Sequence, residues 1–335
     1  MSSLEIALAT FNSSEFLPEQ LDSLFRQTNQ DFKLLISDDG SNDSTFGIIA
    51  DFSERHPGRI RLIQFPTPAG GACANFSRLL DQVTADYVMF CDHDDVWLPG
   101  KVALSLKAIK ALEDVHGADL PLMFHTDLCV TGPDLEVWRS SFWNYSNTDP
   151  NRNSFNNLLM TSIVAGCTLI ANRALYEMAR PIPHDSPMHD SWLALVAGAF
   201  GKIAYSRDAT VLYRQHGNNV LGATEWGPGH IARRIVGTIG GDGVKPLTLQ
   251  ARQAEAFLAR YGNRMNRDQI ESARAMAGLW SRPRRKRFLG LVRANLLRRG
   301  WLQRAALLLT VSAFDGPRAA EAKMPGMPAE TAPQG

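Results

Sequence analysis

The chain has 335 residues, of which 44% are hydrophobic and 21% are charged. This composition is that of a globular protein, and it excludes a mostly disordered chain, a coiled coil and a collagen-like fibre. Its 35 Lys and Arg balance 34 Asp and Glu, so the net charge of +1 gives no argument for a nucleic-acid partner. Four scattered cysteines without a CxxC pair predict reduced thiols rather than a zinc site.

The sequence predicts neither a secretory signal peptide nor a membrane-spanning segment. The first residues lack a basic start followed by an apolar run, and no apolar stretch reaches the roughly 20 residues that span a bilayer. The expected location is therefore the cytoplasm.

The first half alternates between strand and helix patterns. Short apolar runs predict strands at 4–10, 32–37, 60–65 and 87–91. Apolar residues at helical spacing predict helices at 15–27, around 48–52, at 72–83 and from Pro99 to residue 112. Alternation of this kind predicts βαβ units and an α/β fold with a mostly parallel sheet flanked by helices, whose ligands bind beyond the carboxyl ends of the strands.

The second half is less regular. Strands are predicted at 121–127, 165–171 and 211–213, and a helix at 189–200. The stretch 138–157 is rich in aromatic and Asn residues, which is typical of a binding loop. From about residue 231 the pattern is helical, and the segment 316–335, rich in Pro and Ala, is predicted to be a disordered tail.

An acidic cluster, Asp92-His93-Asp94-Asp95, follows a buried strand. Carboxylates this close repel one another, and Mg²⁺ or Mn²⁺ would relieve that repulsion through carboxylate oxygens. The alternative is a solvated turn in which Asp95 only caps the next helix.

Polar residues also follow other predicted elements. Asp38-Asp39-Gly40-Ser41 ends the second strand, where a carboxylate can accept from a nucleobase or ribose, or simply form a turn. Backbone groups of Thr10 to Asn12 can bracket a base or form a plain turn. Asp190 begins an apolar helix, where a cap is the alternative, and His216 can contact a metal or phosphate or stay a surface residue.

Taken in order, these motifs resemble family 2 glycosyltransferases of the GT-A fold. The match rests on Ala9-Thr10-Phe11-Asn12, Ser37 to Ser41, and Asp92 to Asp95. Two further runs, Met188 to Leu193 and Tyr213 to Asn219, resemble the rhamnosyltransferase-like branch. The resemblance covers about residues 4–222.

The resemblance implies an inverting transfer from a nucleotide-diphosphate sugar, assisted by Mg²⁺ or Mn²⁺. It implies a donor-binding half at 1–115 and an acceptor-binding half at 116–222 that includes Gly166-Cys167. The basic helical region assigned to 223–315 is predicted from the sequence pattern instead. The implied donor contacts are Thr10, Asn12, Asp38, Asp39, Asp92 and His216. The implied metal ligands are Asp92, Asp94 and His216, with Asp94 the chief one. The implied general base is Asp190, with Asp185 and Asp127 as rivals, while His189 either assists the acceptor or packs.

Branch resemblance favours dTDP-L-rhamnose as donor, with a UDP-sugar as the alternative, and a cell-surface glycan or lipid-linked glycan as acceptor. A nucleotidyltransferase is disfavoured because no Gly-rich basic loop follows the first strand. A non-catalytic sugar-binding module is the alternative of another class, but it would not need Asp92, Asp94 and Asp190 together.

The segment from Arg282 to Phe314 contains no Asp or Glu, although it carries nine Arg and Lys residues. Apolar side chains such as Phe288, Leu289 and Trp301 interleave with these cations. This mixture predicts either an interfacial helix on anionic lipid or a packing helix with a solvated basic face.

Overall fold

The structure is a computed structural model, and it describes residues 3–217 and 243–316. Within these ranges nine strands form one sheet in the order β3-β2-β1-β4-β8-β6-β9-β5, with β7 paired to β6. The strands are β1 (Leu4–Thr10), β2 (Lys33–Asp38), β3 (Ile60–Ile63), β4 (Tyr87–Cys91), β5 (Val96–Trp97), β6 (Leu122–Thr131), β7 (Val137–Arg139), β8 (Leu169–Asn172) and β9 (Lys202–Arg214). Strands β3, β2, β1 and β4 are mutually parallel, as the βαβ pattern predicts, whereas β8 runs antiparallel to both β4 and β6.

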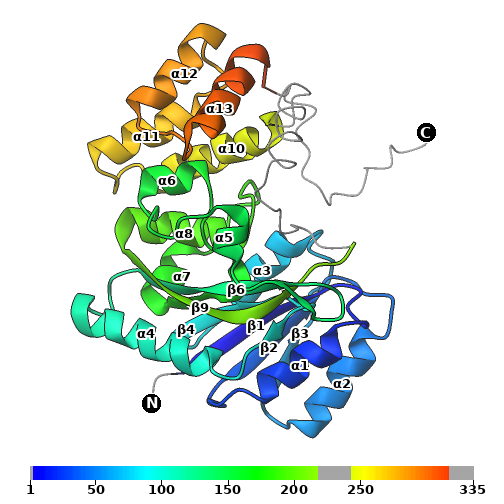
Figure 1. The fold of residues 1–335 in the computed structure, drawn as a ribbon. Coiled ribbons are helices and arrows are strands. Elements are labelled where there is room, and N and C mark those ends of the chain that lie inside the picture. The colour runs from blue at the N-terminus through cyan, green and yellow to red at the C-terminus, as the bar shows by residue number, and fades with distance from the viewer. Residues whose placement is uncertain (1–2, 218–242, 317–335) are drawn as a thin grey trace, which may run out of the picture.

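Helices cover both faces of this sheet (Figure 1). In the first half they are α1 (Leu17–Phe25), α2 (Thr45–Arg55), α3 (Ala72–Asp81) and α4 (Lys101–His116). In the second half they are α5 (Phe142–Ser146), α6 (Phe155–Met160), the short 3₁₀ turn η1 (Gly166–Thr168), α7 (Arg173–Ala179) and α8 (His189–Phe200). The α/β fold with a mostly parallel sheet is therefore confirmed.

Alternate residues of β1 face two separate apolar cores. Leu4, Ile6 and Leu8 pack with α1, α2 and α4 on one face, whereas Ala7 and Ala9 pack with α3, α7 and α8 on the other. Burial on both faces explains why β1 is apolar at every position from Ile6 to Ala9 rather than at alternate positions.

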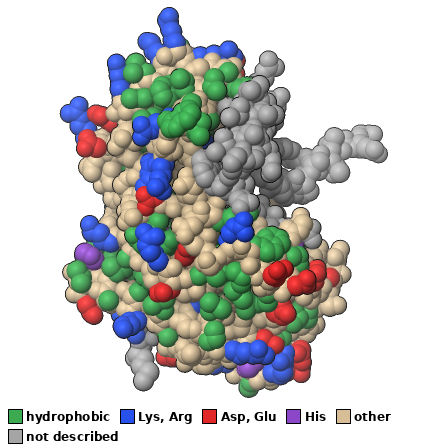
Figure 2. Space-filling model, in the orientation of Figure 1, with side chains coloured by type: hydrophobic (Ala, Val, Ile, Leu, Met, Phe, Trp, Pro, Cys, Tyr) green, Lys and Arg blue, Asp and Glu red, His purple; other side chains and the backbone are tan. Residues whose placement is uncertain are grey.

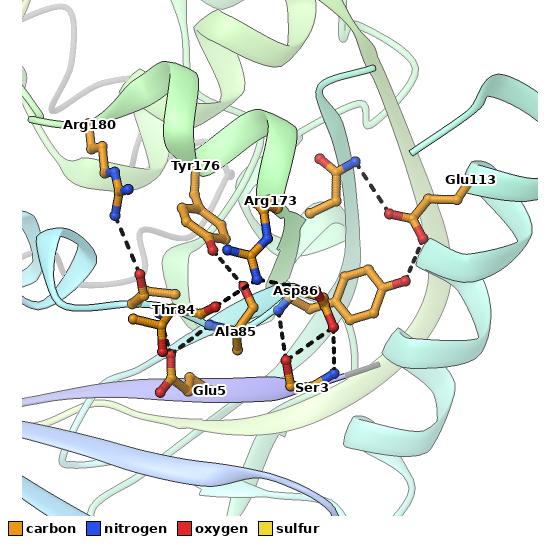
Figure 3. A network of polar contacts seen from close by, with 12 residues as sticks. Ser3, Glu5, Thr84, Ala85, Asp86, Glu113, Arg173, Tyr176 and Arg180 are labelled. Carbon is orange, nitrogen blue, oxygen red and sulfur yellow. Dashed lines mark hydrogen bonds and ion pairs between the residues drawn. The ribbon is translucent and has the colours of Figure 1, made fainter. Parts of the chain in front are cut away.

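A network of polar contacts joins β1, β4, α4 and α7 at the edge of the sheet where β1 and β4 begin (Figure 3). The Glu5 carboxylate accepts from the backbone N–H groups of Thr84 and Ala85 at 2.7 and 3.0 Å. Asp86 accepts from the backbone N–H of Ser3 at 2.8 Å and forms an ion pair with Arg173 at 3.2 Å. These contacts fix the amino ends of the strands. The motifs lie in the turns at the opposite, carboxyl ends.

The stretch 138–157 is only in part the loop that its composition predicts. It contains the end of β7, α5 and the start of α6, and its aromatic residues Trp143 and Phe155 are buried, whereas Trp138 is exposed. Ser141 caps α5 by accepting from the backbone N–H of Asn144 at 3.2 Å, and Trp143 packs edge-on against Tyr205. Local capping and a tertiary aromatic contact thus outweigh the polar composition of this stretch.

Within residues 243–316, four helices follow in the C-terminal region: α10 (Val244–Tyr261), α11 (Arg267–Ala277), α12 (Arg284–Arg293) and α13 (Trp301–Ala313). Phe257 of α10 lies 5.3 Å from Phe155 and 5.4 Å from Trp192 between ring centroids, so this region shares a core with α6 and α8. The predicted helical extension is present over the described part, while residues 223–242 and the predicted tail from residue 317 lie outside the described residues.

Candidate active site

The acidic cluster Asp92 to Asp95, here called the acidic turn, follows β4 at the centre of the sheet. The side chain of Asp95 is fully buried and that of Asp94 nearly so, while Asp92 is half-buried. Asp95 does not cap α4, because Gly100 occupies the N-cap position and no side chain caps that helix. Instead, an oxygen of Asp95 accepts from the backbone N–H of Arg214 at 3.1 Å, which ties the turn to the end of β9. The capping interpretation of Asp95 is therefore wrong.

The acidic turn places carboxyl groups close together where water is largely excluded. Burial, together with the charges of Asp94 and Asp190, raises the pKa of Asp92 to about 8. Carboxylate oxygens of Asp92 and Asp95 and the Cys167 sulfur lie within 4.8 Å of one another. Burial and the two aspartates raise the pKa of the Cys167 thiol well above its usual range, which disfavours the thiolate that zinc sites use. Clustered carboxylates without thiolate fit a hard cation such as Mg²⁺ or Mn²⁺.

The end of β9 packs against the acidic turn. The Nε2 atom of His216 lies 2.9 Å from an oxygen of Asp94. Arg214 is buried, donates from Nε to the Asp94 carbonyl at 2.8 Å and forms an ion pair with Glu19 of α1. The structure thus brings together Asp92, Asp94 and His216, three residues predicted to bind metal, although the sequence spacing gives no sign that Glu19 or Arg214 participates.

A buried cation lies on the other side of the acidic turn. Lys101, the first residue of α4, is fully buried, with its Nζ 3.4 Å from the Thr210 hydroxyl and 4.6 Å from the centre of the Trp97 ring. Burial lowers the pKa of Lys101 to about 8, although the charges of Cys167, Cys91 and Asp95 oppose that shift. Sequence reasoning missed this residue, because a lysine at the start of a helix is ordinarily exposed.

The predicted donor contacts Thr10, Asn12 and Asp38 lie at the carboxyl ends of β1 and β2 and bond to one another or to the turn after β2. The Asp38 carboxylate accepts from the Thr10 hydroxyl at 2.7 Å and from the backbone N–H of Ser41 at 2.7 Å. The Asn12 side-chain oxygen accepts from the backbone N–H of Asn42 at 3.0 Å, and Asn12 adopts a positive φ of 45°. Both side chains therefore shape the turn, and their contact with a base or ribose stays a prediction.

Asp39 points away from that turn toward the loop before α3. Its carboxylate accepts from the backbone N–H groups of Ala69, Gly70 and Gly71, at 2.8 Å for Gly71. Gly71 has a φ of 139°, a backbone conformation that residues with a side chain rarely adopt. The glycine therefore lets three successive N–H groups converge on one carboxylate. Asp39 thus orders the loop beside the predicted donor site.

Asp190 lies in the first turn of α8, where Met188 is the N-cap and no side-chain cap is present. Burial raises the pKa of Asp190 to about 6, although hydrogen bonds from Ser191 and from the Gly166 backbone lower it. A Cβ built on Gly166 would lie 3.6 Å from an Asp190 oxygen, and the sulfur of the next residue, Cys167, lies within 4.8 Å of an Asp92 oxygen, so the amino end of α8 approaches the acidic turn. The structure brings the predicted base and the predicted metal ligands to one site.

His189 packs in the core next to Asp190. Its ring centroid lies 4.1 Å from that of Phe76 and 4.7 Å from that of Phe90, and burial lowers its pKa to about 3. A Cβ built on Gly166 would lie only 2.6 Å from the His189 Nε2 atom. Gly166 therefore has to be glycine for α8 to approach η1 this closely.

The two rival bases occupy other environments. The Asp127 carboxylate accepts from the backbone N–H groups of Phe142 and Trp143 at 3.1 and 3.2 Å, so it holds the start of α5. Asp185 pairs with Arg252 at 3.9 Å and with His184 at 3.4 Å. All three carboxylates have hydrogen-bond or ion-pair partners, and Asp190 differs in lying next to Gly166 of η1, whose neighbour Cys167 is close to Asp92.

The family model described as "Glycosyl transferase family 2" matches residues 5–175, slightly more than half of the chain. The chain belongs to glycosyltransferase family 2. This matched stretch contains the motifs from Thr10 to the acidic turn, whereas Asp190 and His216 lie beyond it. The protein is accordingly a glycosyltransferase.

Curated relatives agree with this assignment. The chain is 29% identical over 227 residues to the dTDP-rhamnosyl transferase RfbG of Shigella flexneri, a match that covers 64% of this chain and 74% of the relative. It is 36% identical over 112 residues to the amylovoran biosynthesis glycosyltransferase AmsB of Erwinia amylovora, covering 33% of this chain and 37% of that protein.

Solved structures share the fold of this glycosyltransferase. The Staphylococcus aureus TarS fragment 1–349 in complex with UDP-GlcNAc matches with a TM-score of 0.51 at 16% identity, covering 93% of this chain and 90% of that one. The mannosyltransferase PcManGT of Pyrobaculum calidifontis, in complex with GDP-Man and Mn²⁺, matches with a TM-score of 0.50 at 18% identity, covering 93% and 80%. At these identities the likeness shows the GT-A fold alone, which confirms the predicted architecture.

Proposed function

We propose that this family 2 enzyme transfers a sugar from a nucleotide-diphosphate donor to a hydroxyl of a cell-surface or lipid-linked glycan, with inversion and with Asp190 as general base. The observation that carries the proposal is the approach of Asp190, at the amino end of α8, to the acidic turn after β4. A Cβ built on Gly166 would lie 3.6 Å from an Asp190 oxygen, and the sulfur of the adjacent Cys167 lies within 4.8 Å of an Asp92 oxygen. A donor diphosphate held at the acidic turn would then face a carboxylate contributed by the other half.

We propose that the metal also binds at the acidic turn. Asp92 and Asp94 would hold Mg²⁺ or Mn²⁺, and His216, 2.9 Å from Asp94, would orient that carboxylate or contact the diphosphate. A divalent cation bound there would offset the negative charge that develops on the departing nucleoside diphosphate. Lys101, buried beneath the turn, adds a fixed positive charge from the protein itself.

Asp190 has the properties that a general base needs. A carboxylate with a pKa of about 6 is ionised at neutral pH and is more basic than an ordinary aspartate. It would accept the proton of the attacking acceptor hydroxyl, and attack from the side opposite the diphosphate inverts the anomeric centre, as in inverting glycosidases. Neither a serine nor a cysteine nucleophile is required.

The donor we propose is dTDP-L-rhamnose, on the strength of the 29% identity to the Shigella flexneri dTDP-rhamnosyl transferase. A UDP-sugar is the alternative of the same class. The donor would lie between the loop that Asp39 orders, the Thr10 to Asn12 turn and the acidic turn, which all follow strands of the half that we assign to residues 1–115. The acceptor would bind the half assigned to residues 116–222, near Gly166 and Asp190.

A panel of nucleotide sugars tests this proposal directly. The thermal midpoint should rise with dTDP-L-rhamnose in the presence of Mn²⁺ and much less without it, because metal and nucleotide each strengthen the binding of the other. Slow hydrolysis of the same donor in the absence of acceptor would identify the sugar. A shift with UDP-sugars alone would reassign the donor, and a shift with no nucleotide sugar would contradict the proposal.

A further inference from the structure

Helices α12 and α13 divide their residues between a core side and an exposed side. Leu291, Leu307 and Val311 are fully buried in the shared C-terminal core. The opposite sides carry large apolar residues in solvent, among them Trp301, which is 75% exposed. The remaining exposed apolar residues of these two helices are Leu289, Val292, Leu308 and Leu309.

Unpaired cations accompany these apolar residues. Arg284 and Arg287 form ion pairs with Asp315, and Arg299 pairs with Asp149. Four other exposed cations of α12 and α13 form no ion pair with a residue of the described ranges: Arg285, Lys286, Arg293 and Arg304. Because residues 282–314 contain no Asp or Glu, this surface has positive charge that nothing within the segment neutralises.

Helical spacing places the two kinds of residue together. In α12, Arg285, Leu289 and Val292 follow one another at intervals of four and three residues, which is one helix face. In α13, Trp301, Arg304 and Leu308 share a face in the same way. Figure 2 shows hydrophobic side chains gathered over the region where Figure 1 places α12 and α13, with Lys and Arg side chains at the margin.

We propose that this surface, made of the exposed residues of α12 and α13 named above, docks on anionic lipid. Apolar side chains within a basic rim match a bilayer whose acyl boundary lies beneath negatively charged headgroups. No helix of the described residues is both long and apolar enough to cross a membrane, and α13 has 13 residues, so the contact would be peripheral. The inference concerns attachment and does not depend on the identity of the donor.

The experiment is sedimentation of the full chain with vesicles of phosphatidylglycerol and phosphatidylcholine in equal parts, compared with phosphatidylcholine alone. We expect binding to the anionic vesicles only, and weaker binding as salt is added. A charge variant replaces Arg285, Lys286, Arg293 and Arg304 with Gln. An apolar variant replaces Trp301, Leu308 and Leu309 with Gln. Each should bind anionic vesicles at least about tenfold more weakly.

A matched control is available on α4, where Lys107, Lys110 and Val115 are exposed. Replacing these three residues with Gln removes two cations and an apolar side chain elsewhere, and it should leave vesicle binding unchanged. Donor hydrolysis should be equal in all four proteins, which shows that each folds.

Three outcomes would overturn the proposal. They are equal binding of the surface variants and wild type, an equal loss in the α4 control, and absence of binding to anionic vesicles. If the surface instead holds nucleic acid or a second copy of the chain, the same variants will weaken that interaction while vesicle binding is absent.

Discussion

The Nε2 atom of His216 lies 2.9 Å from a carboxylate oxygen of Asp94, a residue 122 positions earlier in the chain. One residue follows β9 and the other follows β4, so the contact closes the acidic turn with a strand from the second half. It also gives the Asp94 carboxylate a fixed orientation. A fixed ligand binds a cation with less loss of conformational freedom than a mobile one.

His216→Ala should therefore weaken Mn²⁺-dependent binding of the nucleoside diphosphate by about 10–100-fold, the usual effect of removing a partner of a metal ligand. Isothermal titration with nucleotide and Mn²⁺ together measures it. The control is His184→Ala, whose side chain is 84% exposed and which also lies beside an aspartate. Unchanged affinity in the His216 variant would show that the contact serves only the fold.

Metal removal provides a second prediction. Excess EDTA should abolish sugar transfer, and Asp94→Asn should lower kcat/KM by about 10²–10³-fold, because a bound cation stabilises the transition state by several kcal/mol. The matched control is Asp114→Asn, an exposed aspartate on α4. Wild-type activity in EDTA would contradict the metal assignment, whatever the effect of the Asp94 substitution.

Much of this architecture follows from local patterns. The strands Leu4–Thr10 and Tyr87–Cys91 and the helix His189–Phe200 have the predicted bounds, since buried elements leave apolar runs whose length separates short strands from a longer helix. Because polar residues after parallel strands share one edge of a sheet, the acidic turn and the Asp38 turn were also predictable.

The remaining features depend on contacts between distant residues. Nothing local indicates that Asp95 would bond to Arg214 rather than cap α4, or that the Asp39 carboxylate would gather the N–H groups of residues 69–71. The stretch 138–157 was predicted to be a binding loop because it is rich in aromatic and Asn residues, yet Asp127 and Ser141 together start a helix there. Predicting these contacts requires knowing which distant residues the folded chain brings next to each other.

A third prediction concerns the buried cation. Burial lowers the pKa of Lys101 from 10.5 to about 8, so the charged lysine destabilises the folded state at neutral pH. Between pH 8 and 10.5 the unfolded chain holds more protons than the folded one at this residue, so its contribution to the free energy of unfolding rises with pH.

Lys101→Met should accordingly be more stable than wild type at pH 7, by about 3 kcal/mol, and this difference should shrink as the pH approaches 10.5. Urea unfolding of both proteins at several pH values measures it. Lys107→Met, at an exposed position of the same helix, should show no such trend. A variant less stable than wild type at pH 7 would mean that attraction to Asp95 exceeds the cost of burying the charge.

The last prediction concerns the proposed base. Asp190→Asn keeps the size and one acceptor oxygen of the side chain but removes its basicity. It should lower kcat by about 10²–10⁴-fold, the usual contribution of general acid–base catalysis, while the thermal midpoint and donor binding stay nearly unchanged.

The pH dependence distinguishes this role from a structural one. Asp190 has a pKa raised to about 6 in the free enzyme and must be ionised to accept a proton, so kcat/KM should fall as the pH drops through about 6. The Asp190→Asn variant should lose this acid limb. Two controls are Asp185→Asn, which should keep both rate and limb, and Asp127→Ala, which should destabilise the fold because the start of α5 loses its acceptor. If Asp190→Asn transfers sugar at the wild-type rate with the limb intact, another group is the base, and Asp185 is the first to test.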